Sequence, residues 1–384
     1  MYRLVQRRGI IGLFCLLFVA SSVVPGWAQK DNRFEVSKNL DIFNSLLKEV
    51  EMFYVDSVDV DKTVQRGIEA MLAGLDPYTE YYPEQKTEEL SLMTTGEYGG
   101  IGSLIRQRNN EGGVMIAEPT EGMPADLAGL KPGDLILAID TIDVSKATNS
   151  RVSELLKGVP NTKMVLTIQR PGEKKPRKFE ITRKQITTPQ VTYYGVKNDS
   201  IGYIYLKAFT IKSAQEVKEA FLDLKKNHNI KSLVLDLRGN GGGVLEGAVQ
   251  IVGMFVPKGS EVLSTKGKIK QWDRTYRTST EPLDTVMPLA ILINGGTASA
   301  AEIVSGSLQD MDRAVLVGQR SFGKGLVQAP RDLPYNGKVK ITMSKYYIPS
   351  GRCIQQIDYS HRKEDGSVAA IPDSLTSVFY TSKK

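Results

Sequence analysis

Histidine and cysteine are almost absent from this chain of 384 residues, which contains two of each. Histidine is the usual base beside a serine nucleophile, and most bound transition metals need several histidine or cysteine ligands. His228 and His361 stand among polar and charged residues, which is typical of surface positions. A histidine-based triad and a clustered metal site are therefore not indicated, and we expect no metal and no cofactor.

The N-terminus has the order of a secretory signal peptide. Arginines come first, followed by the apolar run 10–20 and by Gly26-Trp27-Ala28, which fits a small-x-small cleavage site. The apolar run is short for a membrane span, although an uncleaved anchor stays an alternative. We expect residues 1–28 to be removed after Ala28 and the protein to be exported to the periplasm or cell envelope.

Removal of this segment also changes the cysteine content and the charge. Cys15 is lost, so Cys353 remains alone and no internal disulfide can form. A nucleophilic pair of Cys353 with His361 is conceivable, but no surrounding pattern supports it. The net charge of +7 includes three arginines of the N-terminal segment, and the remaining surplus is too small to indicate a nucleic-acid partner.

The rest of the chain divides into three parts. Residues 29–93 are predicted to be largely helical, because apolar residues recur at helical spacing over 36–53 and 60–75. The pattern breaks at Leu75-Asp76-Pro77-Tyr78, and nothing in this part indicates chemistry. Its helices are the candidate surface for a homo-oligomer. Strand and turn signals then fill residues 94–186.

From residue 187 to residue 384 strands and helices alternate, which predicts a mixed α/β core with a largely parallel sheet. The chemistry of such sheets gathers at the C-terminal ends of the strands. Three candidate segments follow predicted strands there, namely 238–243, 294–299 and 318–324.

Ser299 and Lys324 form the candidate catalytic pair. Ser299 follows an apolar run and a glycine turn and precedes a helix start of small residues, which would hold its hydroxyl at the sheet edge. A serine needs a base to take its proton, and an unprotonated lysine can be that base. The alternative for Ser299 is a helix cap, because Ser299 and Glu302 fit a capping box.

A lysine can act as this base only if its pKa is lowered. The ordinary value is about 10.4, so a base that works near neutrality must lose about 3 units. Burial or a neighbouring positive charge supplies such a shift, and no acidic residue occurs between Gly318 and Arg331. Arginine cannot replace this lysine, because it keeps its proton.

Phosphate binding is the alternative interpretation of the glycine-rich segments. The N–H groups of 238–243 can converge on a phosphate or on the oxyanion of acyl transfer. The segment from Gly318 to Lys324 matches a P-loop up to its last position, where Gly325 replaces the serine or threonine that binds magnesium. A strand with a stop at Pro330 is predicted to follow instead of a helix, which argues against an NTPase.

Residues 94–186 resemble a PDZ domain of the bacterial kind. The resemblance rests on a Gly-Ile-Gly loop and on the segment 130–134, Leu-Lys-Pro-Gly-Asp. PDZ domains bind a C-terminal carboxylate in a loop of backbone N–H groups and add the peptide to a sheet edge. The resemblance implies that Gly100, Ile101 and Gly102 form this loop. A turn-rich β domain without a ligand is the alternative.

From about residue 36 to residue 356 the chain resembles the carboxyl-terminal processing (tail-specific) proteases, a serine–lysine family. The resemblance implies an exported endopeptidase with a crotonase-like core and an inserted PDZ-like domain, which cuts exported proteins with apolar tails near their C-termini. The motifs that carry it are 236–243, 294–302, 323–325 with Gln328, and 346–351.

The resemblance also implies roles for single residues. Ser299 would be the nucleophile, Lys324 the general base and Gln328 the residue that orients the lysine. The oxyanion hole would be formed by the N–H of Ala300 together with that of either Gly241 or Gly242.

Members of this family usually continue past the tyrosine-rich segment with a further glycine-rich stretch, which is not found here. We therefore expect a core truncated at its C-terminus. The main alternative function is an inactive homologue that binds C-terminal peptides. A structural partner protein assembled through residues 36–75 is the third interpretation.

Overall fold

The computed structural model describes residues 33–108, 112–364 and 366–371. The predicted signal peptide lies outside the described residues. The chain separates into two compact units, residues 1–68 and residues 69–384.

The first unit contains helix α1 (Arg33–Phe53) and the beginning of α2 (Val60–Ala73), where the sequence predicted helices. No residue of α1 is buried, and Phe34, Leu40 and Leu46 are more than half exposed. The apolar residues of α1 are thus not used to form a core within this unit. No helix in the described ranges combines the length and apolar character that crossing a membrane requires.

In the second unit, one antiparallel sheet has the strand order β3-β4-β5-β7-β8, with β6 paired to β5. Its core is a cluster of aliphatic side chains, because inward and outward residues alternate along strands such as β7. The edge strand β3 contacts helix α5. The elements are α4 (Pro124–Leu127), α5 (Asn149–Leu156), β3 (Ser103–Gln107), β4 (Val114–Pro119), β5 (Leu135–Ile139), β6 (Ile142–Asp143), β7 (Lys163–Gln169) and β8 (Arg177–Thr182).

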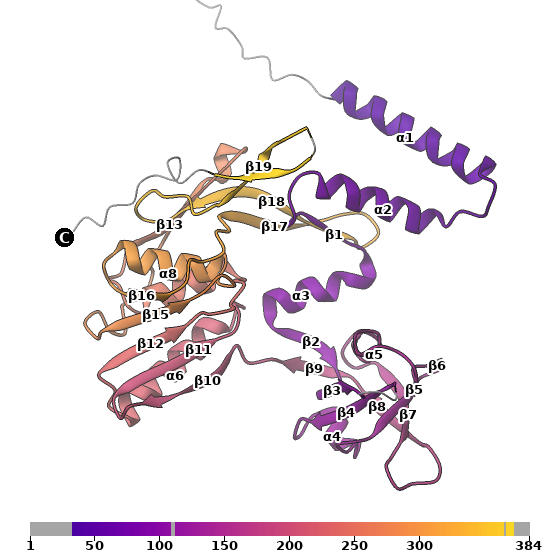
Figure 1. Cartoon of the computed structure of the whole chain (residues 1–384), viewed down its shortest axis with the longest axis horizontal. Helices are drawn as coiled ribbons and strands as arrows, with labels where there is room; N and C mark the ends of the chain where they lie inside the picture. The colour runs from indigo at the N-terminus through magenta and orange to yellow at the C-terminus, as the bar shows by residue number, and fades with distance from the viewer. Residues whose placement is uncertain (1–32, 109–111, 365, 372–384) are drawn as a thin grey trace, which may run out of the picture. The chain divides into compact units, whose positions relative to one another are not determined.

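The α/β core contains a second sheet with the order β10-β11-β12-β15-β16 (Figure 1). Strands β11, β12, β15 and β16 are parallel, and β10 is antiparallel to β11. The predicted mixed α/β class is therefore confirmed. The elements are β10 (Val191–Lys197), β11 (Ile201–Leu206), β12 (Ser232–Asp236), β15 (Leu289–Ile293), β16 (Val315–Gly318), α6 (Ser213–Asn227), α7 (Leu245–Gly253) and α8 (Ala300–Asp310).

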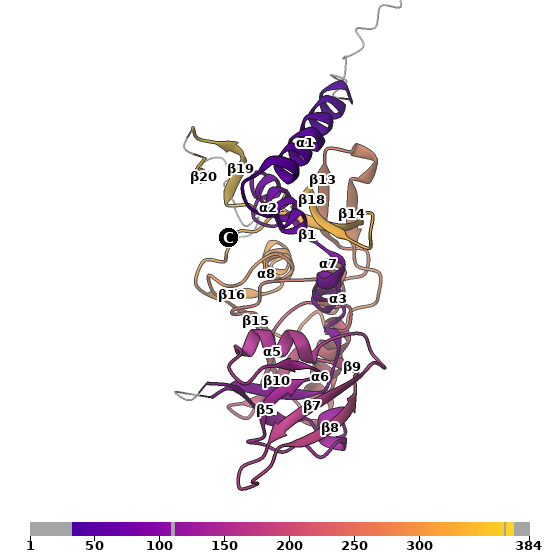
Figure 2. The ribbon, with the colours of Figure 1, turned by 90° about the vertical axis from the view of Figure 1, so that its right-hand side faces the viewer.

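A third, antiparallel sheet was not predicted from the sequence. Strand β18 pairs with β1, β13 and β17, and β13 pairs with β14. Helix α8 contacts β16 of the parallel sheet and β13 of this sheet, and Figure 2 shows it between the two. The strands are β1 (Glu80–Tyr82), β13 (Glu261–Gly267), β14 (Arg274–Arg277), β17 (Leu326–Asp332) and β18 (Lys338–Tyr347).

The predicted strand after Lys324 is β17, but the prediction that Pro330 stops it was wrong. Pro330 pairs with Lys340 and the strand continues to Asp332. In the described structure β17 pairs only with β18, and an edge strand tolerates proline because one side of its backbone needs no partner. The remaining elements are α3 (Thr87–Thr95), β2 (Glu97–Gly100), β9 (Lys184–Thr187), β19 (Ile357–Arg362), β20 (Val368–Ala370) and the short 3₁₀ helices 84–86 and 270–272.

The stability of the α/β core should depend on Phe221 of α6. Its ring is fully buried and packs edge-on against Phe255, with 5.4 Å between ring centroids. We expect Phe221→Ala to lower the free energy of unfolding by about 3–5 kcal/mol, because it leaves a cavity. Leu222→Ala, next to it but 40% exposed, should cost less than about 1 kcal/mol. Denaturant unfolding measures both values, and an equal loss in the free energy of unfolding for the two variants would contradict this assignment of the core.

Candidate active site

Ser299 connects β15 to α8 in a strained backbone conformation. Its φ is 56° and its ψ is −117°, a region that residues other than glycine rarely adopt. Such strain costs about 1–3 kcal/mol and persists only where the surroundings impose it. The helix-cap interpretation also holds, since Ser299 is the N-cap and its N–H donates to the Glu302 carboxylate at 2.8 Å. The cap and the nucleophile roles are thus compatible.

The turn before Ser299 is held against the glycine turn 238–243. Thr297 Oγ1 donates to Leu237 O at 2.8 Å, and Ala298 N donates to Asn240 O at 2.9 Å. Asn240 is fully buried and donates through Nδ2 to Leu206 O at 2.9 Å. Two segments that follow neighbouring parallel strands are therefore joined at one edge of the sheet, as the sequence predicted.

Gly242 lies so close to the Ser299 turn that no side chain fits there. A Cβ on Gly242 would be 2.8 Å from Ser299 Cβ and 2.9 Å from Ala300 N, and its φ is 94°. The N–H of Gly242 donates to Asn240 Oδ1 at 2.9 Å. No hydrogen bond among the described residues uses the N–H of Gly241, which is exposed. Of the two glycines, Gly241 therefore has the N–H available for an oxyanion.

The carboxylate of Glu302 joins the serine turn to the lysine loop. Its Oε2 accepts from Ser299 N at 2.8 Å and from Lys324 N at 2.9 Å, and its Oε1 accepts from Gly323 N at 2.7 Å. Glu302 is only 3% exposed, and burial raises its pKa although these hydrogen bonds oppose the shift. The sequence predicted its capping role but not its contact with the lysine loop.

Tyr346 of β18 makes a second connection between the same two segments. Its hydroxyl lies 2.8 Å from Lys324 O and 3.2 Å from Ser299 O. The side chain is buried, and burial raises its pKa, so the hydroxyl keeps its proton and donates. Sequence reasoning noted the tyrosine-rich segment 346–351 but gave Tyr346 no role.

The environment of the Lys324 side chain favours its neutral form. Burial lowers its pKa, and the ammonium of Lys340 lowers it further, while Asp76, Glu80 and Glu302 act in the opposite direction. The stretch around Lys324 contains no acidic residue, but the fold brings these carboxylates from distant parts of the chain. The net direction is a lowered pKa.

The amine of Lys324 rests on an aromatic ring. Its Nζ lies 4.2 Å from the centroid of Tyr78, a residue in the part where the sequence indicated no chemistry. Among the hydrogen bonds of the described residues, none joins Nζ to Ser299 Oγ or to Gln328. The Gln328 side chain instead donates through Nε2 to Thr342 Oγ1 at 3.1 Å. A proton transfer from Ser299 to Lys324 would therefore require side-chain movement.

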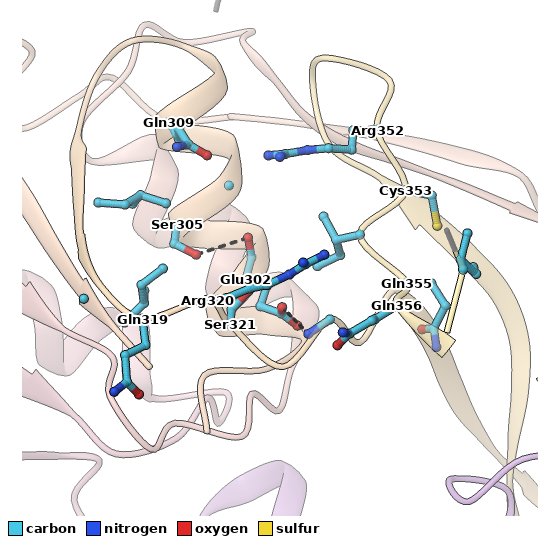
Figure 3. Close-up of a pocket in the computed structure, with 17 residues that line it drawn as sticks. Glu302, Ser305, Gln309, Gln319, Arg320, Ser321, Arg352, Cys353, Gln355 and Gln356 are labelled. Atoms are coloured by element: carbon cyan, nitrogen blue, oxygen red, sulfur yellow. Dashed lines mark hydrogen bonds between the residues drawn. The ribbon is translucent and has the colours of Figure 1, made fainter. Parts of the chain in front are cut away.

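A cavity of about 420 Å³ lies along the side of α8. Glu302 and Gly323 are among its lining residues, whereas Ser299 and Lys324 are not. Figure 3 shows the side chains of Arg320 and Arg352 extending toward it from two loops. The cavity thus adjoins the lysine loop, but neither Ser299 nor Lys324 lines it.

Of the Gly-Ile-Gly sequence, Gly100 is the last residue of β2 and pairs with Lys184 of β9, whereas Ile101 and Gly102 lie between β2 and the edge strand β3. The carbonyl of Ile101 accepts from Ala125 N at 2.8 Å and that of Gly102 from Thr120 N at 2.9 Å, which fixes the loop. No backbone hydrogen bond in the described part of the chain uses the N–H of Ile101 or Gly102. Both residues are buried, and their role in a carboxylate-binding loop stays a prediction.

The alternative nucleophile pair, Cys353 with His361, is not formed. His361 is exposed and contacts Asp358 Oδ2 at 2.7 Å, and no hydrogen bond between described residues joins it to Cys353. Burial raises the pKa of Cys353, which favours the unreactive thiol.

The lowered pKa of Lys324 predicts a stability effect. The unfolded chain binds this proton more tightly than the folded chain, so the folded state is penalised at neutral pH. We expect Lys324→Met to raise the free energy of unfolding at pH 7, with a gain that shrinks as pH rises toward the ordinary lysine pKa of about 10.4. Denaturant unfolding at several pH values measures this, with exposed Lys174→Met as control. A gain that is independent of pH would contradict the pKa shift.

Comparison with known proteins agrees with this geometry. The model of peptidase family S41 matches residues 200–360, and that of the PDZ domain matches residues 115–170. The carboxy-terminal-processing protease of Bartonella bacilliformis is 36% identical over 345 residues, which are 89% of this chain and 77% of that protein. A Staphylococcus aureus protein described as a probable CtpA-like serine protease is 33% identical over 82% of this chain.

This chain spans 62% of the Staphylococcus aureus relative, which is therefore considerably longer. Among solved structures, the photosystem II D1 C-terminal processing protease is 29% identical, with a TM-score of 0.45. The match covers 80% of this chain and 82% of that protease. The matched family, the PDZ match and the 36% identical relative lead to one conclusion: the chain belongs to peptidase family S41 and is a carboxy-terminal-processing protease with a PDZ domain.

Proposed function

We propose that this protein is an exported serine endopeptidase in which Ser299 is the nucleophile and Lys324 the general base. The observation that supports this best is the single oxygen Oε2 of Glu302, which accepts from the N–H groups of both residues. Two residues that are distant in sequence thereby belong to one site. The half-buried lysine, the strained serine and the adjacent glycine turn would supply the remaining parts.

The reaction would begin when the neutral amine of Lys324 turns from Tyr78 toward Ser299 Oγ. The amine takes the hydroxyl proton while Oγ forms a bond to the carbonyl carbon of the substrate. The resulting oxyanion would receive hydrogen bonds from the N–H of Ala300, at the start of a helix, and of Gly241. One such donor typically stabilises the transition state by about 3 kcal/mol.

The lysine ammonium then gives its proton to the leaving nitrogen, and the C–N bond breaks to leave an acyl-enzyme. Water attacks the ester with the amine again acting as base, which releases the product and restores Ser299. Lys324 therefore alternates between neutral and charged forms, so its pKa must permit both.

We further propose that the PDZ domain selects substrates by their C-terminal tails. The available N–H groups of Ile101 and Gly102 would receive the terminal carboxylate. Leu104, which is exposed on the edge strand β3, would contact an apolar tail residue. An exported, unfolded protein with an apolar C-terminus is the substrate class that these features fit.

Two further proposals concern the N-terminus. The signal sequence of residues 1–28 supports export to the periplasm or cell envelope. The exposed apolar residues of α1 support self-association, with a second copy of the chain as the partner. Gel filtration of a variant with polar residues at Leu40 and Leu46 tests this self-association.

The alternative, an inactive peptide-binding homologue, is favoured by one observation. In the described structure the amine of Lys324 lies over Tyr78 and makes no hydrogen bond with Ser299. Binding of a peptide would be common to both functions, whereas cleavage distinguishes them.

Replacement of either catalytic residue should abolish proteolysis. Ser299→Ala and Lys324→Arg are expected to show no cleavage of an unfolded protein with an apolar C-terminal tail, while circular dichroism shows an intact fold. In the wild type, kcat/KM should fall as pH drops through the lowered pKa of Lys324, because the base becomes protonated. Substantial cleavage by either purified variant would remove the serine–lysine assignment.

Recognition of the tail can be measured without cleavage in the Ser299→Ala variant. A labelled peptide with a free apolar C-terminus should bind roughly ten to a hundred times more tightly than its C-terminal amide, because hydrogen bonds to a charged group are the stronger ones. Equal dissociation constants for the two peptides, measured by fluorescence anisotropy, would exclude binding of the terminal carboxylate by this loop.

A further inference from the structure

A short segment after α2, residues 76–79, lies against the catalytic part of the antiparallel sheet. Asp76 and Thr79 are buried, although the residues around them are largely exposed. Strand β1 follows directly and pairs with the start of β18, which places Thr79 beside Thr342. The sequence indicated no chemistry in this segment, and the mechanism above uses none of its hydrogen bonds.

The carboxylate of Asp76 fixes the hydroxyl of Thr79. Asp76 Oδ1 accepts from the N–H groups of Tyr78 and Thr79, both at 2.8 Å, and Oδ2 accepts from Thr79 Oγ1 at 3.0 Å. An ionised carboxylate only accepts hydrogen bonds, so the single hydroxyl proton of Thr79 points toward Asp76.

This direction determines the next hydrogen bond. Thr79 Oγ1 lies 3.3 Å from Thr342 Oγ1, and it accepts from Thr342 N at 3.1 Å. Because the proton of Thr79 is already donated to Asp76, the proton between the two hydroxyls comes from Thr342. The oxygen of Thr342 then has room for a donor on its other side.

That donor is the side chain of Gln328, whose Nε2 lies 3.1 Å from Thr342 Oγ1. A glutamine amide has a donor end and an acceptor end. With its nitrogen directed to Thr342, the amide presents Oε1 at its other end. Only this oxygen can accept a hydrogen bond from the lysine amine, whereas a reversed amide would present N–H groups to an ammonium.

The same segment also touches the lysine directly. The ring of Tyr78 lies 4.2 Å from Lys324 Nζ, and Tyr78 in turn packs edge-on against Tyr359. An aromatic face excludes water from one side of the amine and favours its charged form. Residues 76–79 thus contact Lys324 and, through Thr342, Gln328, for which the family resemblance implies the role of orienting the lysine.

We propose that residues 76–79 are a positioning element for the catalytic lysine, in which Asp76, through Thr79 and Thr342, fixes the Gln328 amide with its oxygen toward Lys324. Asp76, Thr79 and Thr342 are positioning residues, since they act through Gln328. The inference rests on the proposed serine–lysine function and adds the N-terminal part of the chain to the site.

Thr79 offers the sharpest test, because its replacements separate the hydroxyl from the side-chain volume. Thr79→Val breaks the chain of hydrogen bonds, and we expect kcat to fall about tenfold with KM changed less than about twofold. Thr79→Ser keeps the hydroxyl and should stay within about twofold of the wild type. Thr278→Val is the matched control, since Thr278 is also 4% exposed but its hydroxyl contacts only the backbone of Pro257 and Ser260.

A double-mutant cycle shows whether Thr79 acts through Gln328. In a Gln328→Ala background, Thr79→Val should lower kcat less than twofold, because the group that it positions is gone. The proposal would be overturned if Thr79→Val lowered kcat equally in both backgrounds. It would also be overturned if Thr278→Val lowered kcat as much as Thr79→Val, or if Thr79→Ser did not restore kcat.

A second measurement is independent of turnover. The side-chain amide resonance of Gln328, assigned by its disappearance in Gln328→Ala, should shift in Thr79→Val and stay unchanged in Thr278→Val. If the Gln328 resonance had the same chemical shift in Thr79→Val as in the wild type, the positioning role would be refuted, even if the enzyme were inactive. Cleavage by Ser299→Ala or Lys324→Arg, in contrast, would refute the proposed function while leaving this resonance test unaffected.

Discussion

The candidate site depends on one buried carboxylate. Glu302 accepts hydrogen bonds from three backbone N–H groups that belong to two separate segments, those of Ser299, Gly323 and Lys324. A buried charge is tolerated only where such donors replace water. Each segment therefore needs the other to satisfy its polar groups, and the strained conformation of Ser299 is held by this mutual dependence rather than by local preference.

Two opposing sets of interactions determine the pKa of Lys324. Burial and Lys340 favour the neutral amine, while Tyr78 and the carboxylates around it favour the ammonium. A site with burial alone would produce a base but would make the protonated lysine that follows the first proton transfer costly. Because the proposed reaction needs both forms in turn, the carboxylates that reduce the pKa shift would stabilise the lysine ammonium in the second half of the cycle.

The sequence predicted the parallel sheet and its turns well, and for a physical reason. Strands such as β11 and β15 are continuous apolar runs covered by other elements, and their C-terminal ends must meet at one edge. Ser299, Lys324 and the glycine turn could thus be placed from sequence alone. The long strand β18 was not predicted, although polar and apolar residues alternate strictly over residues 338–344, a pattern typical of a half-buried strand.

The role of residues 76–79 could not have been read from the sequence either. An Asp-Pro-Tyr-Thr stretch is an ordinary turn signal, and the partner that gives it meaning, Thr342, lies 263 residues away. Hydrogen bonds between side chains so distant in the chain leave no periodic pattern. Only the pairing of β1 with β18 brings them together.

The parts of the site belong to two different sheets, and this division has a mechanical consequence. Ser299, Ala300 and the glycine turn 238–243 follow strands of the parallel sheet, whereas Gln328 and Thr342 lie on the antiparallel sheet, and Lys324 lies two residues before its strand β17. A displacement of one sheet relative to the other would separate serine from lysine without unfolding either. Glu302 and Tyr346 oppose that displacement, because each binds both residues through the backbone. Alignment of the two sheets would therefore determine how closely the side chains of Ser299 and Lys324 can approach each other.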